Sequence, residues 1–310
     1  MACAGSALRS GSRPFDREGR AVRFLPGAAL MILLPGLCGA AELTIGLIPE
    51  QNVFKQKERY TPLGQYLERK TGVKIQFTIL SRYGNILDRF AAEHMDGAFF
   101  GSFTGALAIR RLGVEPLARP VNLDGTSTYR GYIFVRKDGG IRTVADMKGK
   151  RLAFVERSTT AGYVYPMAFF REKGVSDIAA YFSEHYFAGS HDAAVYAVVE
   201  GKADVGCAKH SMFDRVSRKD SRVAQELAVL ETSPDVPSNG LCVKSGLDAE
   251  IRKRIKAVLL KMDQEPEGIE VLRTFEALRF VPTSKDDYTV VFEIAKRAGI
   301  DIDTYSYANE

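Results

Sequence analysis

Short apolar runs alternate with segments of helical periodicity along most of the chain. The run Leu43 to Ile48 stops at Pro49, which is typical of a buried parallel strand. The same kinds of pattern predict strands over 73–79, 97–101, 132–136, 151–155, 203–206 and 241–243, and helices over 60–71, 85–94, 104–112, 162–173, 195–200 and 248–263. A short helical turn over 144–148 and a last helix from about residue 285 complete the series. Repeated strand–helix units indicate an α/β protein whose sheets are mixed, mostly parallel and covered by helices.

The alternation is interrupted once, at Asp138-Gly139-Gly140, and then starts again. We therefore expect two lobes, one formed by 42–137 plus 241–310 and the other by 138–240. The last helices have no strands of their own and should pack on the first lobe. Crossings near Lys137 and Gly240 would form a two-strand hinge, a geometry that suits closure around a ligand.

Residues 1–41 have the order of a secretory signal. Five arginines up to Arg23 precede an apolar run over 24–34, and small residues lead up to Ala41. We expect this segment to be cleaved and the mature protein to reside in the periplasm. Cys38 invites a lipid anchor, but Leu37 before it is larger than a lipid-attachment site accepts, so anchoring is disfavoured.

Composition narrows the class of protein. The 310 residues are 45% hydrophobic and 26% charged, which suits two globular domains. The net charge of +5 lies largely in the first 41 residues, so it does not argue for nucleic acid. Beyond the signal only Cys207 and Cys242 remain, either as a disulfide or as two buried thiols, of which the second is favoured. That pair is too small for a metal site, and no cofactor is expected.

Three strand-to-helix junctions carry the polar residues that could bind a ligand. Ser158, Thr159 and Thr160 follow a strand and precede a helix, where unpaired backbone N–H groups and the helix dipole attract anions. A single hydroxyl would suffice as an ordinary helix cap, so three in a row favour an anion site. Ser102 lies at a similar junction, and His191 stands where a loop enters a helix; each has an ordinary structural alternative, a cap or a surface histidine.

Tyr83 is a fourth candidate, in a loop before an apolar helix, with a packed tyrosine as the alternative. Enzymatic signatures are missing from the sequence: it has no nucleophile elbow, paired-carboxylate cleft, metal cluster or Gly-Lys-Ser phosphate loop. We therefore expect a binding protein and not an enzyme.

Taken together, the segments resemble one family over nearly the whole mature chain. The Tyr83 loop, the run Asp96 to Gly101, the run Ser158 to Tyr163 and His191 with its following helix are similar in order and spacing to the phosphate/phosphite/phosphonate-binding proteins of ABC importers. That family is a branch of the type II periplasmic binding fold. The resemblance implies a monomer that binds a small oxyanion and delivers it to an ABC permease in the membrane, with no nucleic-acid partner.

Residue by residue, the resemblance implies ligand contacts from Tyr83, Thr159, Thr160 and His191, and three positions depart from it. Phe100 stands where the family often has Tyr, Ala161 where a hydroxyl residue is common, and Asn239 where an aspartate is expected. These changes remove donors and a carboxylate, which leaves open a different oxyanion or a less charged ligand. The alternative function is a periplasmic sensory subunit that presents an oxyanion, such as one of arsenic, to a membrane histidine kinase.

Overall fold

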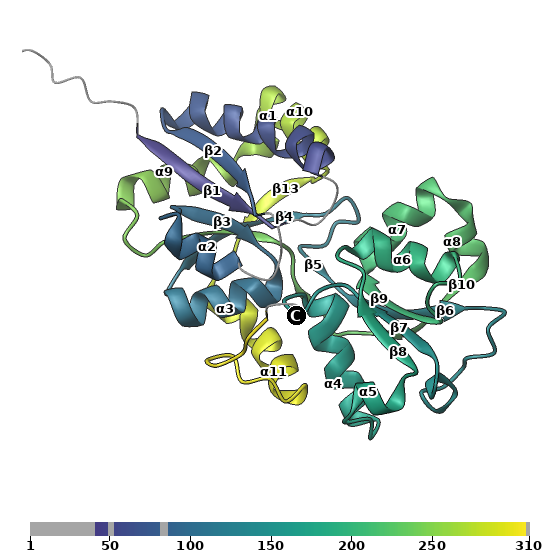
Figure 1. The fold of residues 1–310 in the computed structure, drawn as a ribbon. Coiled ribbons are helices and arrows are strands. Elements are labelled where there is room, and N and C mark those ends of the chain that lie inside the picture. The colour runs from purple at the N-terminus through teal and green to yellow at the C-terminus, as the bar shows by residue number, and fades with distance from the viewer. Residues whose placement is uncertain (1–40, 49–52, 81–85, 308–310) are drawn as a thin grey trace, which may run out of the picture. The chain divides into compact units, whose positions relative to one another are not determined.

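Two sheets, each with its own helices, organise the computed structural model, which describes residues 41–48, 53–80 and 86–307 (Figure 1). The first sheet has the order β13-β4-β12-β3-β1-β2, and the second has the order β10-β6-β9-β7-β8. The α/β class and the two-lobed architecture expected from the sequence are confirmed. The strands of the first sheet are β1 (Glu42–Leu47), β2 (Lys74–Ile79), β3 (Gly97–Phe100), β4 (Glu115–Val121), β12 (Gly240–Val243) and β13 (Arg279–Pro282). Those of the second are β6 (Gly131–Arg136), β7 (Arg151–Phe154), β8 (Glu184–Phe187), β9 (Val205–Lys209) and β10 (Leu227–Thr232).

Both sheets are mixed, and most of their strands share one direction. In the first sheet β1 pairs in parallel with β2 and β3, whereas β12 and β13 run the opposite way. In the second sheet β7 pairs in parallel with β8 and β9, and β6 runs the opposite way. The parallel strands end on the side where the chain turns into helices, and those turns carry the polar residues of the site described below.

Helices cover both faces of each sheet, as the alternation of side chains along the strands requires. On the first sheet, α1 (Val53–Thr71), α9 (Ala249–Leu259) and α10 (Pro266–Phe275) share one apolar cluster, and α2 (Ile86–Ala92) and α3 (Ser102–Leu112) another. On the second sheet, α6 (His191–Val199), α7 (His210–Lys219) and α8 (Ser221–Glu226) pack together, and α4 (Tyr165–Glu172) and α5 (Ile178–Tyr181) cover the other face. In the described helices no segment is both long and apolar enough to cross a bilayer.

A short antiparallel ribbon joins the two lobes. It consists of β5 (Thr128–Tyr129) and β11 (Val236–Pro237), with Tyr129 opposite Val236. Asn122 Nδ2 strengthens the ribbon by donating to Ser238 Oγ over 3.1 Å. The two-strand hinge is therefore present, and its second crossing lies just before Gly240 as expected.

The first crossing lies earlier than the sequence pattern indicated. β6 pairs with β9 and β10, so residues 131–136 belong to the second lobe and not to 42–137. The break at 138–140 is a turn within that lobe, where Gly139 N–H donates to Arg136 O and Gly140 has a φ of 70°. The expected boundary at residue 137 is thus corrected to the segment before β6.

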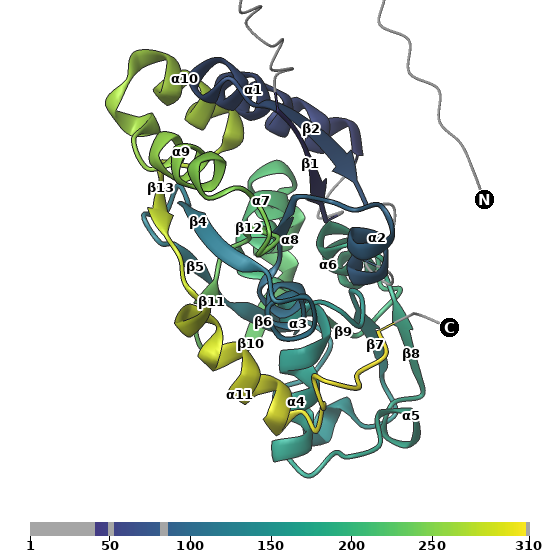
Figure 2. The same cartoon turned by 90° about the vertical axis from the view of Figure 1, so that its left-hand side faces the viewer.

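The C-terminal helix α11 (Thr289–Arg297) contacts both lobes and not the first alone (Figure 2). It packs on α3 of the first lobe and on α4 of the second, where Arg297 pairs with Glu172. Beyond it, Tyr305 hydroxyl donates to Arg157 O over 3.0 Å. Only α9 and α10 follow the expected return to the first lobe, because their apolar faces pack with α1.

Cys207 and Cys242 are separate buried thiols. Cys207 lies in β9 of the second sheet and Cys242 in β12 of the first. Burial raises the pKa of Cys242 to about 12 and shifts the pKa of Cys207 in the same direction. The interpretation as two buried thiols is confirmed over the disulfide.

In a chain starting at Glu42, both thiols should resist a water-soluble disulfide reagent in the native state and react fully in guanidinium without reductant. A cysteine reacts with such a reagent as an exposed thiolate, and burial keeps both of these thiols protonated and out of reach. Thiol titration measures this. Rapid native labelling, or failure of the unfolded chain to react without reductant, would contradict it.

Candidate functional site

A small cavity of about 20 Å³ lies where the two lobes meet. Its wall comes from loops and helix starts of both lobes and from the connecting ribbon. The polar side chains in this wall are buried, so water is largely excluded from them. The lining residues are Ile48, Gly101, Ser102, Phe103, Thr104, Tyr129, Ser158, Thr159, Thr160, His191, Lys209 and Asn239.

Helices begin at this cavity from four directions. Ser102 is the first residue of α3, and His191 is the first residue of α6. Thr160 opens the π-turn Thr160–Val164 that leads into α4, and Lys209 is the cap before α7. The first N–H groups of a helix have no partner within it, and the dipole places positive charge there. Several such ends around one cavity form an anion-binding arrangement.

Three hydroxyls from different parts of the fold meet in the wall. Ser102 Oγ and Thr160 Oγ1 are 2.7 Å apart and share a hydrogen bond between the lobes. Ser102 Oγ also shares one with the hydroxyl of Tyr129 in the ribbon. A site built in this way exists only when both lobes approach, which ties its formation to the hinge.

The turn that presents Thr159 and Thr160 depends on Gly162. Thr159 Oγ1 donates to Glu156 O over 2.6 Å, and Val164 N–H donates to Thr159 O over 3.0 Å, as in a π-turn. A Cβ on Gly162 would lie 2.4 Å from Val155 Cβ, so only glycine fits here. The hydroxyl run therefore has its backbone held tightly against β7.

The imidazole of His191 has one defined tautomer. Lys209 N–H donates to His191 Nδ1 over 3.1 Å, so in the neutral ring the proton lies on Nε2. His191 is buried in the cavity wall. The ring therefore offers a donor, which suits an oxyanion better than a cation.

Lys209 brings a cation into the wall. Its side chain is 8% exposed, its Nζ donates to Asn239 Oδ1 over 3.4 Å, and it lies 4.5 Å from the centre of the Tyr129 ring. Asn239 Nδ2 is buried and has no hydrogen-bond partner among the described residues. Neither Asp nor Glu belongs to the described cavity wall. The described wall thus combines an ammonium group, an amide and hydroxyls at the starts of helices.

The structure brings six of the eight sequence-predicted site residues together and places a seventh, Phe100, outside the cavity wall. Those in the wall are Ser102, Ser158, Thr159, Thr160, His191 and Asn239. Tyr83 lies outside the described residues. Phe100 points into the core against Phe90, with ring centres 5.6 Å apart, because β3 is covered by helices on both faces.

Sequence reasoning missed Tyr129 and Lys209. Lys209 could have been found, since it ends a buried strand and precedes a helix, the same signal that identified Thr160 and His191. Tyr129 carries no such signal, because its place depends on the ribbon pairing. These two residues add a hydroxyl and an ammonium group to the cavity wall beyond those expected from the sequence.

The comparisons with known proteins identify the class. Residues 45–288 match the model of a family described as the periplasmic substrate-binding protein of the phosphonate ABC transporter. The chain belongs to this family, and so it is a substrate-binding protein of an ABC importer and not an enzyme. The alternative of a sensory subunit for a histidine kinase receives no support from these matches.

Characterised relatives are similar over most of their length. The phosphate-import protein PhnD of Mycolicibacterium smegmatis is 29% identical over 255 residues, which cover 74% of this chain and 79% of that protein. The phosphonates-binding periplasmic protein of Escherichia coli is 26% identical, with 74% of this chain and 69% of that protein covered.

Solved structures of similar fold include two from this functional class. The binding component of a phosphonate ABC transporter from Pseudomonas aeruginosa has a TM-score of 0.76 at 20% identity, covering 84% of this chain and 87% of its own. A binding protein from Prochlorococcus marinus in complex with methylphosphonate has a TM-score of 0.74 at 20% identity, with coverage of 84% and 99%. At this identity they show the two-lobed fold.

Long-range proton–nitrogen correlation spectra should show the neutral His191 ring as the Nε2–H tautomer alone. The amide of Lys209 holds Nδ1 as an acceptor, so the other tautomer would lose that hydrogen bond. His185, half-buried in β8, is the internal reference. A proton on His191 Nδ1 would contradict this geometry.

Proposed function

We propose that the protein captures a small tetrahedral oxyanion, namely phosphate, phosphite or a phosphonate, and delivers it to an ABC permease. The observation that carries this proposal is the convergence of helix starts at Ser102, Thr160 and His191 on a buried wall that also holds Lys209. Such a wall supplies N–H and O–H donors together with positive charge. An oxyanion needs both when it leaves water, because an unpaired buried charge is costly.

The names of the relatives support this ligand class. One imports phosphate, another is a probable phosphite-binding protein from Prochlorococcus marinus that is 21% identical to this chain, and a third binds phosphonates. All three ligands are tetrahedral anions with at least two oxygens that accept hydrogen bonds. The cavity between the lobes offers donors from several directions, as such a shape requires.

Lobe closure would complete the site. The hydrogen bond between Ser102 and Thr160 joins the lobes directly, and the Tyr129 ribbon lies beside it. A hinge that opens would separate these donors and release the ligand. A permease that recognises only the closed form would then receive loaded protein.

Export and assembly form part of the same proposal. The arginines, apolar run and small residues of 1–41 favour a cleaved signal peptide, and the family is described as periplasmic. We propose that the mature protein acts as a monomer in the periplasm.

Replacing Thr160 by Ala should weaken binding of the tightest of phosphate, phosphite and methylphosphonate by about 1–3 kcal/mol, because a buried charged oxygen loses a donor. Isothermal titration measures this, with Thr160→Ser expected to retain most of the affinity.

Thr274→Ala is the matched control, since Thr274 is exposed on α10 and does not belong to the cavity wall. Its affinity should equal that of the unaltered protein. If the Thr160→Ala and Thr274→Ala proteins bound the anion equally well, the binding site would lie elsewhere. If the unaltered protein bound none of the three anions, the proposed ligand class would be rejected.

A further inference from the structure

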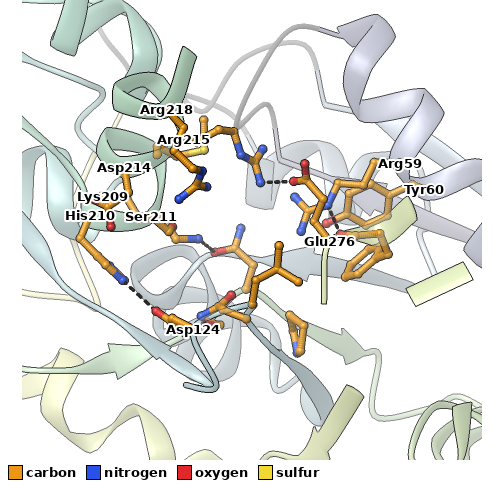
Figure 3. Close-up of a pocket in the computed structure, with 17 residues that line it drawn as sticks. Arg59, Tyr60, Asp124, Lys209, His210, Ser211, Asp214, Arg215, Arg218 and Glu276 are labelled. Atoms are coloured by element: carbon orange, nitrogen blue, oxygen red, sulfur yellow. Dashed lines mark hydrogen bonds and ion pairs between the residues drawn. The ribbon is translucent and has the colours of Figure 1, made fainter. Parts of the chain in front are cut away.

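The two lobes also touch outside the ribbon and the cavity of the site. In a larger cavity of about 130 Å³, Arg215 of α7 pairs with Glu276 at the C-terminal end of α10 (Figure 3). A second contact is made by the chain beyond α11, where Tyr305 touches α3 in one lobe and the turn that follows β7 in the other. This hydroxyl turn, residues 156–160, carries Ser158 and Thr160 of the cavity wall. The second contact therefore bears on the site itself.

The end of the described chain is fixed to the first lobe. Arg111 of α3 donates to Ile302 O and to Tyr305 O, each over 2.8 Å. Leu87 N–H of α2 donates to the hydroxyl of Tyr307 over 3.2 Å. The backbone on both sides of Tyr305 is thus bonded to helices of the first lobe.

The side chain of Tyr305 reaches across to the second lobe. Its ring packs edge-on against the ring of Phe103 in α3, with ring centres 5.6 Å apart. Its hydroxyl donates to Arg157 O over 3.0 Å. Burial raises the pKa of Tyr305, so this hydroxyl keeps its proton and remains a donor well above neutral pH. One side chain therefore contacts the residue after Ser102 in one lobe and the residue before Ser158 in the other.

The bond to Arg157 O fixes the peptide unit that leads into the hydroxyls. The carbonyl of Arg157 and the N–H of Ser158 belong to one planar peptide, so holding the oxygen also orients the amide. Ser158 lines the cavity of the site. One peptide earlier, the N–H and the Oγ1 of Thr159 donate to Glu156 O over 3.0 and 2.6 Å. The hydroxyl turn is thus fastened from within by Thr159 and from the other lobe by Tyr305.

We propose that Tyr305 is a positioning residue for ligand binding, whose hydroxyl holds the hydroxyl turn in the geometry that the closed site needs. This inference rests on the proposed oxyanion function and deepens it. Tyr305 does not belong to the described cavity wall, so it acts through the turn and not by touching the ligand. What it supports is the hydrogen bond between Ser102 and Thr160, because it contacts the start of α3 and the turn that carries Thr160.

Tyr305→Phe removes the hydroxyl and keeps the ring that packs against Phe103. In isothermal titration it should weaken binding of the tightest of phosphate, phosphite and methylphosphonate by about two- to tenfold, as the loss of one hydrogen bond allows. Tyr307→Phe is the matched control, because it removes a hydroxyl that bonds Leu87 within the first lobe, and it should leave the affinity unchanged. Unchanged affinity of the Tyr305→Phe protein, or equal weakening by both variants, would overturn the inference.

Combining Tyr305→Phe with Thr160→Ala tests whether Tyr305 acts through the hydroxyl turn. The Thr160→Ala protein already lacks a hydroxyl that the turn presents. Adding Tyr305→Phe to it should therefore reduce the affinity by a smaller factor than in the unaltered protein. If the two factors were equal, Tyr305 would act independently of Thr160, and the inference would be overturned.

Hydrogen exchange measured without any anion separates this inference from the proposed function. The backbone amides of residues 156–164 should exchange several-fold faster in the Tyr305→Phe protein than in the unaltered or the Tyr307→Phe protein, because the turn loses its bond to the other lobe. Unchanged exchange in this segment would overturn the inference. If the unaltered protein bound none of the three anions, the proposed function would be rejected, and the exchange result would still decide whether Tyr305 holds the turn.

Discussion

The backbone amides at the starts of helices, which a helix cannot pair within itself, are the constraint on which the site depends. A helix cannot satisfy its own first N–H groups, and burying them without partners costs free energy. Here α3, the turn before α4 and α6 begin at one buried cavity, from both lobes. Such a wall is stable when an acceptor lies in the cavity or when solvent reaches it through an open hinge, and so binding and closure are linked.

The hinge and the hydroxyls link the formation of this site to the approach of the two lobes. Tyr129 is held by the ribbon, Ser102 by the first lobe and Thr160 by the second, and their hydroxyls meet. The C-terminal helix α11 contacts both lobes, which limits how the lobes move relative to each other. Lys209 adds an ammonium group to a wall whose other described donors are hydroxyls, an amide and an imidazole.

Local sequence signals predicted much of the described cavity wall. Thr160, His191 and Ser102 each follow a strand and open a helix, and that junction is visible in the chain itself. Phe100 was wrongly expected in the wall because a resemblance indicates which position matters but not where its side chain points. In β3 the side chain of Phe100 packs in the core. Tyr129 was missed because its position follows from strand pairing.

The sequence likewise predicted part of the fold. Apolar runs identified β1, β3 and β7, whereas β4 and β13 were missed because prolines and arginines interrupt their patterns. The lobe boundary was misplaced because Gly139 and Gly140 are a strong turn signal, while the pairing of β6 with β9 cannot be seen in a local window. Long-range pairing decides which lobe a strand joins.

The most direct test of the central claim is a crystal structure of the protein with its tightest phosphonate ligand. The account predicts the phosphonate oxygens within hydrogen-bond distance of the amides or hydroxyls of Ser102 and Thr160 and of His191 Nε2. A phosphonate bound with none of these groups in contact would contradict it.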